Sequence, residues 1–157
     1  MKKQILDTPQ ITISGVHRFI FRDAHTNAIL EDITYSNMIM NSCTEMLATK
    51  LAGGSNDCNI TYAALGTGTG TIDGTETTMF TELERKLVAG IAANGSNVEI
   101  SSYFGPLEAI GTLTEWALFG QAASSTPDSG TMISHLSISK VKTALMTLSI
   151  DSTITFS

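Results

Sequence analysis

Apolar and polar residues alternate along most of the chain, which is the pattern of strands that bury one face. The clearest case is residues 143–156, where apolar side chains from Ala144 to Phe156 occupy even positions and mostly Thr or Ser lies between them. One face of this strand is expected in a core and the other in a polar environment. Shorter segments bounded by turn residues predict six further strands, at residues 10–22, 28–35, 59–65, 98–104, 112–119 and 131–139.

One segment has helical spacing instead. Ser36 and Asn37 are suitable N-cap residues, and an apolar stripe of Ile39, Cys43, Met46, Leu47 and Leu51 follows before Gly53-Gly54. This predicts an amphipathic helix over about residues 37–52 whose stripe packs on the core. Residues 77–87, with Thr81-x-x-Glu84 as a partial capping box, allow a second short helix. The expected fold is mainly β, an antiparallel β-sandwich of about seven strands with one amphipathic helix.

The length of 157 residues corresponds to one domain. We expect a single β-sandwich domain at residues 10–157, with Gly15 as a bulge in its first strand, preceded by an N-terminal arm at residues 1–9. Lys2 and Lys3 resemble the start of a secretion signal, but the apolar run ends at Asp7. Neither a signal peptide nor a membrane-spanning segment is therefore expected.

Composition argues against nucleic-acid binding. Charged residues make up only 15% of the chain and the formal net charge is −6, whereas binding to nucleic acid depends on basic residues that neutralise phosphates. The 22 Thr, 16 Ser and 13 Gly are typical of a β-rich protein with weakly charged faces, and such faces often contact other subunits. Cys43 and Cys58 are too few to define a disulfide framework and are expected to be reduced.

The run of Gly and Thr between residues 64 and 76 is the one stretch that resembles a ligand-binding motif. A phosphate loop needs a Lys after its last Gly, yet no Lys or Arg lies between Lys50 and Arg85. The spacing of Gly66, Gly68 and Gly70 also differs from the dinucleotide pattern. We expect a surface loop between strands and no cofactor.

Metal and nucleophile motifs are missing as well. The three His residues fall in no zinc motif, and four Asp residues in expected loops lack the spacing of a calcium loop and are interpreted as solvated turn residues. No catalytic, cofactor-binding or metal-binding residue is assigned. The residues considered are His17, His25, His135, Asp57, Asp73, Asp128 and Asp151.

Two other site hypotheses remain open. A small hydrolase could use Glu82, Glu108 or Glu115, and this hypothesis predicts a cleft in which one of these carboxyl groups is desolvated and has a raised pKa. A carbohydrate- or receptor-binding module would use exposed aromatic residues, including Trp116. With one Trp and three Tyr in the chain, core packing of Trp116 is the favoured interpretation.

Several short motifs resemble, in their order, small virion structural proteins of tailed bacteriophages, in the tail-fibre, collar or head-decoration class. The similarity covers residues 62–156, although Ala117 stands where Gly is usual and Asp151-Ser152 where a Trp is expected. The motifs are Tyr-Ala-Ala-Leu-Gly-Thr-Gly at 62–68, Glu-Leu-Glu-Arg-Lys at 82–86, Phe-Gly-Pro-Leu-Glu-Ala at 104–109, Glu-Trp-Ala-Leu-Phe at 115–119, and Lys-Thr at 142–143 leading into residues 148–156.

The resemblance implies an assembly role. The expected function is that of a non-enzymatic structural protein of the virion, synthesised in the host cytoplasm, which binds capsid, neck or tail proteins as an adaptor or decoration subunit. A homo-oligomer or many copies on the particle are expected. No nucleic acid, membrane or cofactor partner is expected. The residues agree with this role because a weakly charged β domain can bury area in an interface without burying charge.

Overall fold

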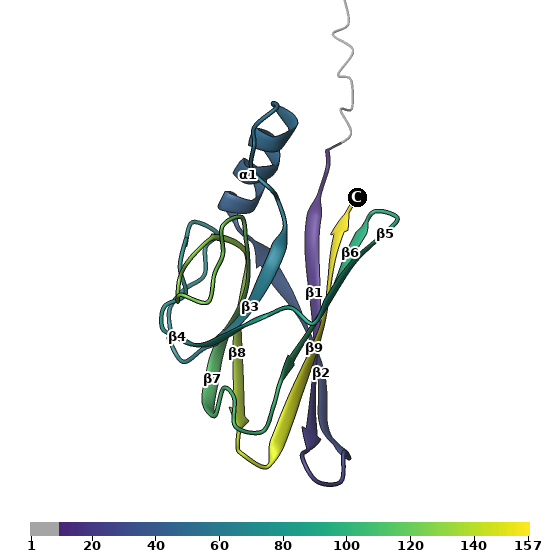
Figure 1. Cartoon of the computed structure of the whole chain (residues 1–157), viewed down its shortest axis with the longest axis vertical. Helices are drawn as coiled ribbons and strands as arrows, with labels where there is room; N and C mark the ends of the chain where they lie inside the picture. Colours follow the sequence, from purple (N-terminus) through teal and green to yellow (C-terminus); the bar gives the residue numbers. More distant parts are fainter. Residues whose placement is uncertain (1–9) are drawn as a thin grey trace, which may run out of the picture.

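The computed structural model describes residues 10–157, so the N-terminal arm expected at residues 1–9 lies outside the described residues (Figure 1). Nine strands and one helix follow in chain order. They are β1 (Ile13–Asp23), β2 (Ile29–Ile39), α1 (Asn41–Leu51), β3 (Ile60–Gly66), β4 (Glu82–Leu87), β5 (Gly90–Asn94), β6 (Asn97–Phe104), β7 (Gly111–Gly120), β8 (Thr131–Lys142) and β9 (Met146–Phe156).

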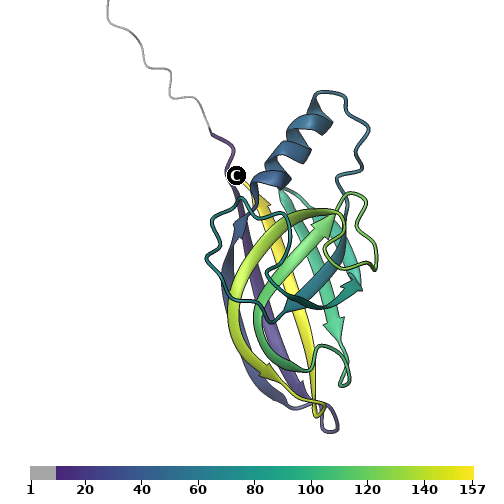
Figure 2. The same cartoon turned by 90° about the vertical axis from the view of Figure 1, so that its left-hand side faces the viewer.

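All nine strands belong to one antiparallel sheet, in the order β4-β3-β7-β8-β2-β1-β9-β6-β5. The sheet curls into a half-barrel, as Figures 1 and 2 show. Its two halves are joined where Met38 pairs with His135 and Ile39 pairs with Ser134, at the end of β2. The antiparallel, mainly β prediction is confirmed, but the seven-stranded sandwich is wrong. Alternation along a strand shows which of its faces is buried. It does not show that one long strand, here β2, pairs with both halves of the sheet.

Two edge strands account for the difference in strand number. The second helix predicted over residues 77–87 is wrong, because residues 82–87 form β4 and pair with β3 from Gly66 opposite Glu82 to Tyr62 opposite Leu87. The tertiary partner overrides the weak local preference for a helix. Strand β5 was not predicted. It pairs with β6 through the two-residue turn Gly95-Ser96, in which Gly95 has a φ of +60°, as a type II′ turn requires.

Helix α1 begins later than predicted, at Asn41. Ser36 and Asn37 do not cap it, since they continue β2 and pair with Val16 and Gly15. Gly15 is therefore in register and is not a bulge. The side chain of Asn37 fills the space that a Cβ at position 15 would need.

The main core lies inside the curl of the sheet. Trp116 is fully buried at its centre and meets the rings of Phe19 and Phe104 edge to face, at centroid distances of 5.7 and 6.5 Å. Alternate residues of β9, including Leu148 and Ile150, are buried, which confirms the pattern from which that strand was predicted. Core packing of Trp116 is confirmed as well.

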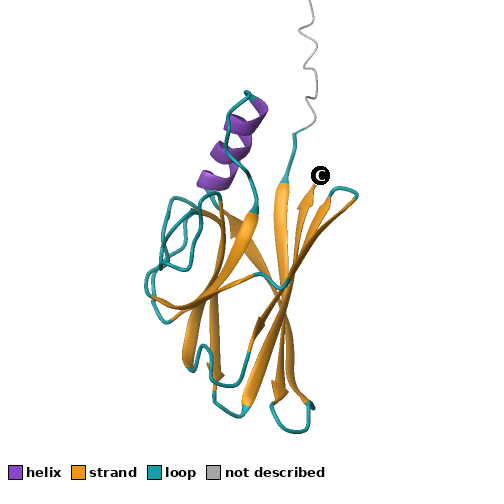
Figure 3. Cartoon of the chain, viewed as in Figure 1, coloured by secondary structure: helices purple, strands orange, loops and turns teal. Residues whose placement is uncertain are grey.

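The opposite face of β3, β7 and β8 is covered by a second, smaller apolar cluster. The loops at residues 67–81 and 121–130 contribute to this cover. This half of the sheet is thus buried on both faces, while helix α1 stands at one end of the sheet (Figure 3). The buried members of the cluster are Met40, Ala64, Met79, Ala117, Phe119 and Met132.

Candidate functional site

The Gly/Thr run is a loop after β3, as predicted, and Glu115 of β7 holds it in place. The Glu115 carboxylate accepts hydrogen bonds from the backbone N–H groups of Gly68, Phe80 and Thr81 at 2.9, 2.9 and 2.8 Å. His135 Nε2 lies 3.0 Å from the same carboxylate. A Cβ at Gly68 would collide with Phe80 and Glu115. Within the Gly/Thr run, the N–H of Gly68 is thus directed to a carboxylate of the chain itself and not to an external anion.

Electrostatics show that Glu115 is an anion at neutral pH. Burial by itself would raise the pKa of this carboxyl group, but the hydrogen bonds from His135, Thr81, Phe80 and Gly68 outweigh burial and hold the pKa below its ordinary value. A carboxylate in this state is a strong acceptor and a poor proton donor. Its observed contacts fasten residues 68–81 to β7.

Glu82 and Glu108 lie in separate networks. Arg85 donates two hydrogen bonds to Glu82, at 2.6 and 2.7 Å, and both side chains are almost fully buried. The Lys86 ammonium, together with the N–H of Gly105, holds the pKa of Glu108 below its ordinary value. The hydrolase hypothesis predicted a raised pKa for a desolvated carboxyl group. The pKa values of Glu108 and Glu115 are shifted in the opposite direction.

The three His residues are not brought together. His17 lies in the core, with Nδ1 2.7 Å from Ser152 Oγ, while His25 is exposed in the turn after β1 and His135 contacts Glu115. Burial lowers the pKa of His17 to about 4, and the Asn37 side chain offsets only part of this shift. Within residues 10–157, no group of three or more His, Cys, Asp or Glu side chains could hold a metal ion.

The Asp residues follow the sequence interpretation with one exception. Asp57, Asp73 and Asp128 lie in loops, and Asp73 accepts hydrogen bonds from the N–H and Oγ1 of Thr75, as an Asx turn does. Asp151 was placed in a loop, and that placement is wrong. It lies within β9, opposite Arg18 of β1 and Ser101 of β6.

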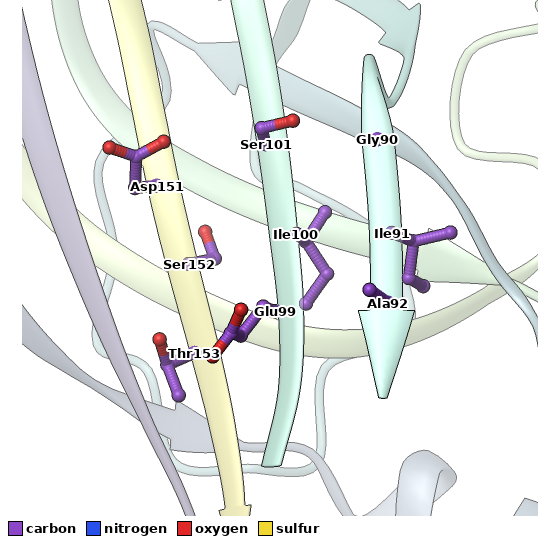
Figure 4. Close-up of a pocket in the computed structure, with 9 residues that line it drawn as sticks. All are labelled: Gly90, Ile91, Ala92, Glu99, Ile100, Ser101, Asp151, Ser152 and Thr153. Atoms are coloured by element: carbon purple, nitrogen blue, oxygen red, sulfur yellow. The ribbon is translucent and has the colours of Figure 1, made fainter. Parts of the chain in front are cut away.

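Asp151 borders a shallow hollow on the outer face of β5, β6 and β9, which Figure 4 shows. Its polar lining consists of Glu99, Asp151 and the hydroxyl groups of Ser101 and Thr153, since the Ser152 hydroxyl faces His17 in the core. These residues offer acceptors and no basic side chain. We do not treat this hollow as the functional site, because two separate carboxylates and a few hydroxyl groups define no specific chemistry.

The strongest candidate is an apolar groove beside α1, which we call the helix-side groove. It consists of two hollows of about 370 and 490 Å³ that share Leu47, Cys58 and Phe156. The first hollow lies between α1 and the ends of β3, β5, β6, β8 and β9, and the second lies between α1 and the start of β1. The lining residues are Ile11, Ile13, Cys43, Thr44, Met46, Leu47, Ala48, Lys50, Leu51, Cys58, Asn59, Ile60, Ile91, Ala92, Ala93, Val98, Ile133, Ile154 and Phe156.

Large apolar side chains remain exposed at this groove. Leu51 is 89% exposed and Ile11 is 81% exposed. The helix stripe was expected to pack on the core, and this is correct for the buried Cys43 and Met46 but wrong for Leu51. Among the described residues that line the groove, Lys50 alone is charged, and its Nζ donates a hydrogen bond to the carbonyl of Asn56 at 2.8 Å.

Both cysteines line the groove as free thiols. Burial, and to a smaller extent the neighbouring Cys58, raises the pKa of the Cys43 thiol to about 11. A thiol with this pKa is almost entirely protonated at neutral pH and is a weak nucleophile. Cys43 therefore contributes apolar lining to the groove.

The sequence predicted strands or a helix for most of these residues, but not for Cys58 or for Ile91 to Ala93, and it did not place them in one site. The ends of elements distant in sequence meet beside α1, and no local motif records this meeting. Comparison with family models, with curated proteins and with solved structures finds no match to this chain. Among residues 10–157, no helix has the length and apolar character needed to cross a membrane.

Proposed function

We propose that the chain is a non-enzymatic assembly subunit of a tailed-bacteriophage particle and that it binds another virion protein through the helix-side groove. The exposed apolar lining of this groove is the observation that carries the proposal. Contiguous exposed apolar surface of this kind is typical of a protein-binding site. The phage assignment rests on the order of the short motifs between residues 62 and 156.

The chemistry of the groove defines its partner. An apolar lining is suited to apolar side chains, because their burial is favourable and removes little hydration from charged groups. Lys50 adds one positive charge to the lining. The partner is therefore a segment of another virion protein that presents apolar side chains and a carboxylate within reach of Lys50.

The buried charged groups support a non-enzymatic role. Glu115 and the Glu82–Arg85 pair fasten the two loops over the outer face of the sheet, since Arg85 also donates to the carbonyls of Ser124 and Ser129 at 3.0 Å. Their hydrogen-bonding capacity is used within the chain. The carbohydrate-binding alternative loses its expected platform, because Trp116 is fully buried.

Cross-linking mass spectrometry on intact particles tests the proposal. Particles purified from the producing bacterial strain would be treated with a lysine-reactive reagent and digested. We expect the chain in the particles, with cross-links from Lys50 to a capsid, neck or tail protein. Links to the major capsid protein would indicate decoration, and links to a fibre or tail protein would indicate an adaptor.

Lys140 provides the internal control for this experiment. It lies seven residues along β8 from Ile133, which lines the groove, so the two are separated by about 23 Å of extended strand. We expect links at Lys50 to exceed those at Lys140. Absence of the chain from purified particles would contradict the virion assignment, while links confined to Lys140 would contradict the groove as the binding surface.

A further inference from the structure

Strand β5 leaves one edge of the sheet open. Within the described part of the chain, residues 10–157, it is the last strand in the sheet order and pairs with β6 alone. Its sequence, Gly-Ile-Ala-Ala-Asn, has no charged residue and no Pro, and all residues after Gly90 are exposed. An exposed edge with free N–H and C=O groups is a template for another strand, and natural proteins usually protect such edges with charges, Pro or covering loops.

The opposite edge of the same sheet is protected in this way. Strand β4 has the sequence Glu-Leu-Glu-Arg-Lys-Leu, with four charged residues among six. The loop at residues 121–130 also bonds to it, because the guanidinium of Arg85 donates to the carbonyls of Ser124 and Ser129. The chain therefore protects one edge and leaves the other open.

We propose that β5 pairs with β5 of a second copy of this chain, antiparallel and across a two-fold axis, so that the two nine-stranded sheets become one. The two-residue turn fixes which groups are free. Pairing between β5 and β6 closes at Asn94 and Asn97, and alternate residues of an antiparallel ladder bond on the same side. By this alternation, Ile91 and Ala93 direct their N–H and C=O groups to the open edge.

The side chains of β5 suit self-pairing. With the axis at Ala92, each Ala92 faces its counterpart, and each Ile91 faces Ala93 of the other copy. A small residue thus lies at the axis, where the backbones approach most closely, and a large residue is matched with a small one on either side. Ile91, which is 48% exposed, would be covered.

Charge does not oppose pairing with a second copy, even though the chain has a net charge of −6. The strand itself is uncharged, so no like charges lie opposite each other in the new ladder. The nearest carboxylate is Glu99 of β6, which pairs with Ala92. Two Glu99 residues would lie about 14 Å apart, three strand spacings, which exceeds the screening length of about 8 Å at physiological ionic strength.

Analytical ultracentrifugation of the purified chain tests this inference without any phage component. We expect a monomer–dimer equilibrium over protein concentrations of about 5–500 μM. Ile91→Lys places a charge at the new contact and should raise the dissociation constant at least tenfold. Leu87→Lys is the matched control, because Leu87 is an exposed apolar residue on the protected edge strand, and this change should leave the dissociation constant within twofold of wild type.

A cross-link provides a second, positive test that does not depend on destabilising substitutions. The Cα atoms of the two Ala92 residues should lie about 4.5 Å apart, which a disulfide can span. Ala92→Cys should form a covalent dimer on mild oxidation, with peptide mapping that joins residue 92 to residue 92. Thr153→Cys, on the same face of the sheet but away from the edge, should not.

Three results would overturn the proposal. One is a wild-type chain that remains monomeric throughout the concentration range. Another is a dimer whose dissociation constant is unchanged by Ile91→Lys. The third is failure of Ala92→Cys to link while the Thr153→Cys variant does. Because every measurement uses the purified chain, these results do not depend on whether the chain belongs to a virion, although Ile91, Ala92 and Ala93 of β5 also line the helix-side groove.

Discussion

Protonation of His17 should destabilise the fold between pH 7.5 and pH 5. The side chain is fully buried, and burial lowers its pKa from 6.5 to about 4. The unfolded state therefore binds more protons than the folded state below pH 6.5, so stability is lost as the pH falls. This window lies above the range in which carboxyl groups with lowered pKa values, such as Glu115, begin to contribute.

The two pKa values of His17 set the magnitude of this loss. Each pKa unit corresponds to about 1.4 kcal/mol, and titration of the unfolded state down to pH 5 gives a loss of about 2 kcal/mol. With a urea m-value of about 2 kcal/mol/M for a chain of this size, the unfolding midpoint should fall by about 1 M. A folded-state pKa as high as 5 reduces the loss only to about 1.6 kcal/mol.

Urea unfolding followed by Trp116 fluorescence at several pH values measures this effect. His17→Asn retains a polar atom near the Nδ1 position but cannot titrate, so its unfolding free energy should change by about 2 kcal/mol less than that of wild type over the same pH range. His25→Asn, in the exposed turn, is the control and should retain the full dependence. Equal pH dependence in wild type and His17→Asn, or a His17 proton resonance that titrates near pH 6.5, would refute the reasoning.

Three further predictions concern the two thiols and the Glu115 clasp, that is, the hydrogen bonds through which the Glu115 carboxylate holds the loop at residues 67–81. Glu115→Gln should lower the unfolding free energy by about 2–3 kcal/mol in urea titrations, because an amide cannot accept all the hydrogen bonds that the buried carboxylate accepts; a change below 0.5 kcal/mol, on the order of a surface substitution, would contradict this. Gly68→Ala should increase hydrogen exchange over residues 67–81, since its Cβ collides with Phe80, and unchanged exchange would contradict the clasp. Cys43 should react with iodoacetamide at pH 7.5 more slowly than Cys58, and equal rates would contradict its raised pKa.

Local patterns predict most strands of this fold because they record which face of each strand is buried. The regular alternation in β9 is an example, and the seven strands predicted from such patterns are all present. The patterns fail at the edges. Strand β5 buries too little to alternate clearly, and β4 carries charges that suit a helix as well as a protected edge. Ser36 and Asn37 would suit a helix cap, but in the structure they pair with Val16 and Gly15 of β1.

The candidate site could not be predicted from local patterns because its parts meet only in three dimensions. Leu51 belongs to an apolar stripe that would suit a core, and its exposure depends on where α1 stands relative to β1. The Glu115 clasp joins residues that are 34 to 47 positions apart in the sequence. The lack of a basic residue, by contrast, is a local property of the sequence and by itself argues against a phosphate loop.

Incorporation of groove variants into particles tests the account most directly. Ile11→Glu/Leu51→Glu changes two exposed side chains of the helix-side groove, and Leu107→Glu, at an equally exposed residue in the β6–β7 connection, is the control. Each variant would be supplied in cells in which the wild-type gene is inactivated, and its amount per particle would be quantified by mass spectrometry. We predict at least a tenfold loss of the double variant from particles and normal incorporation of Leu107→Glu. Normal incorporation of a folded double variant would contradict the claim that the groove is the assembly surface.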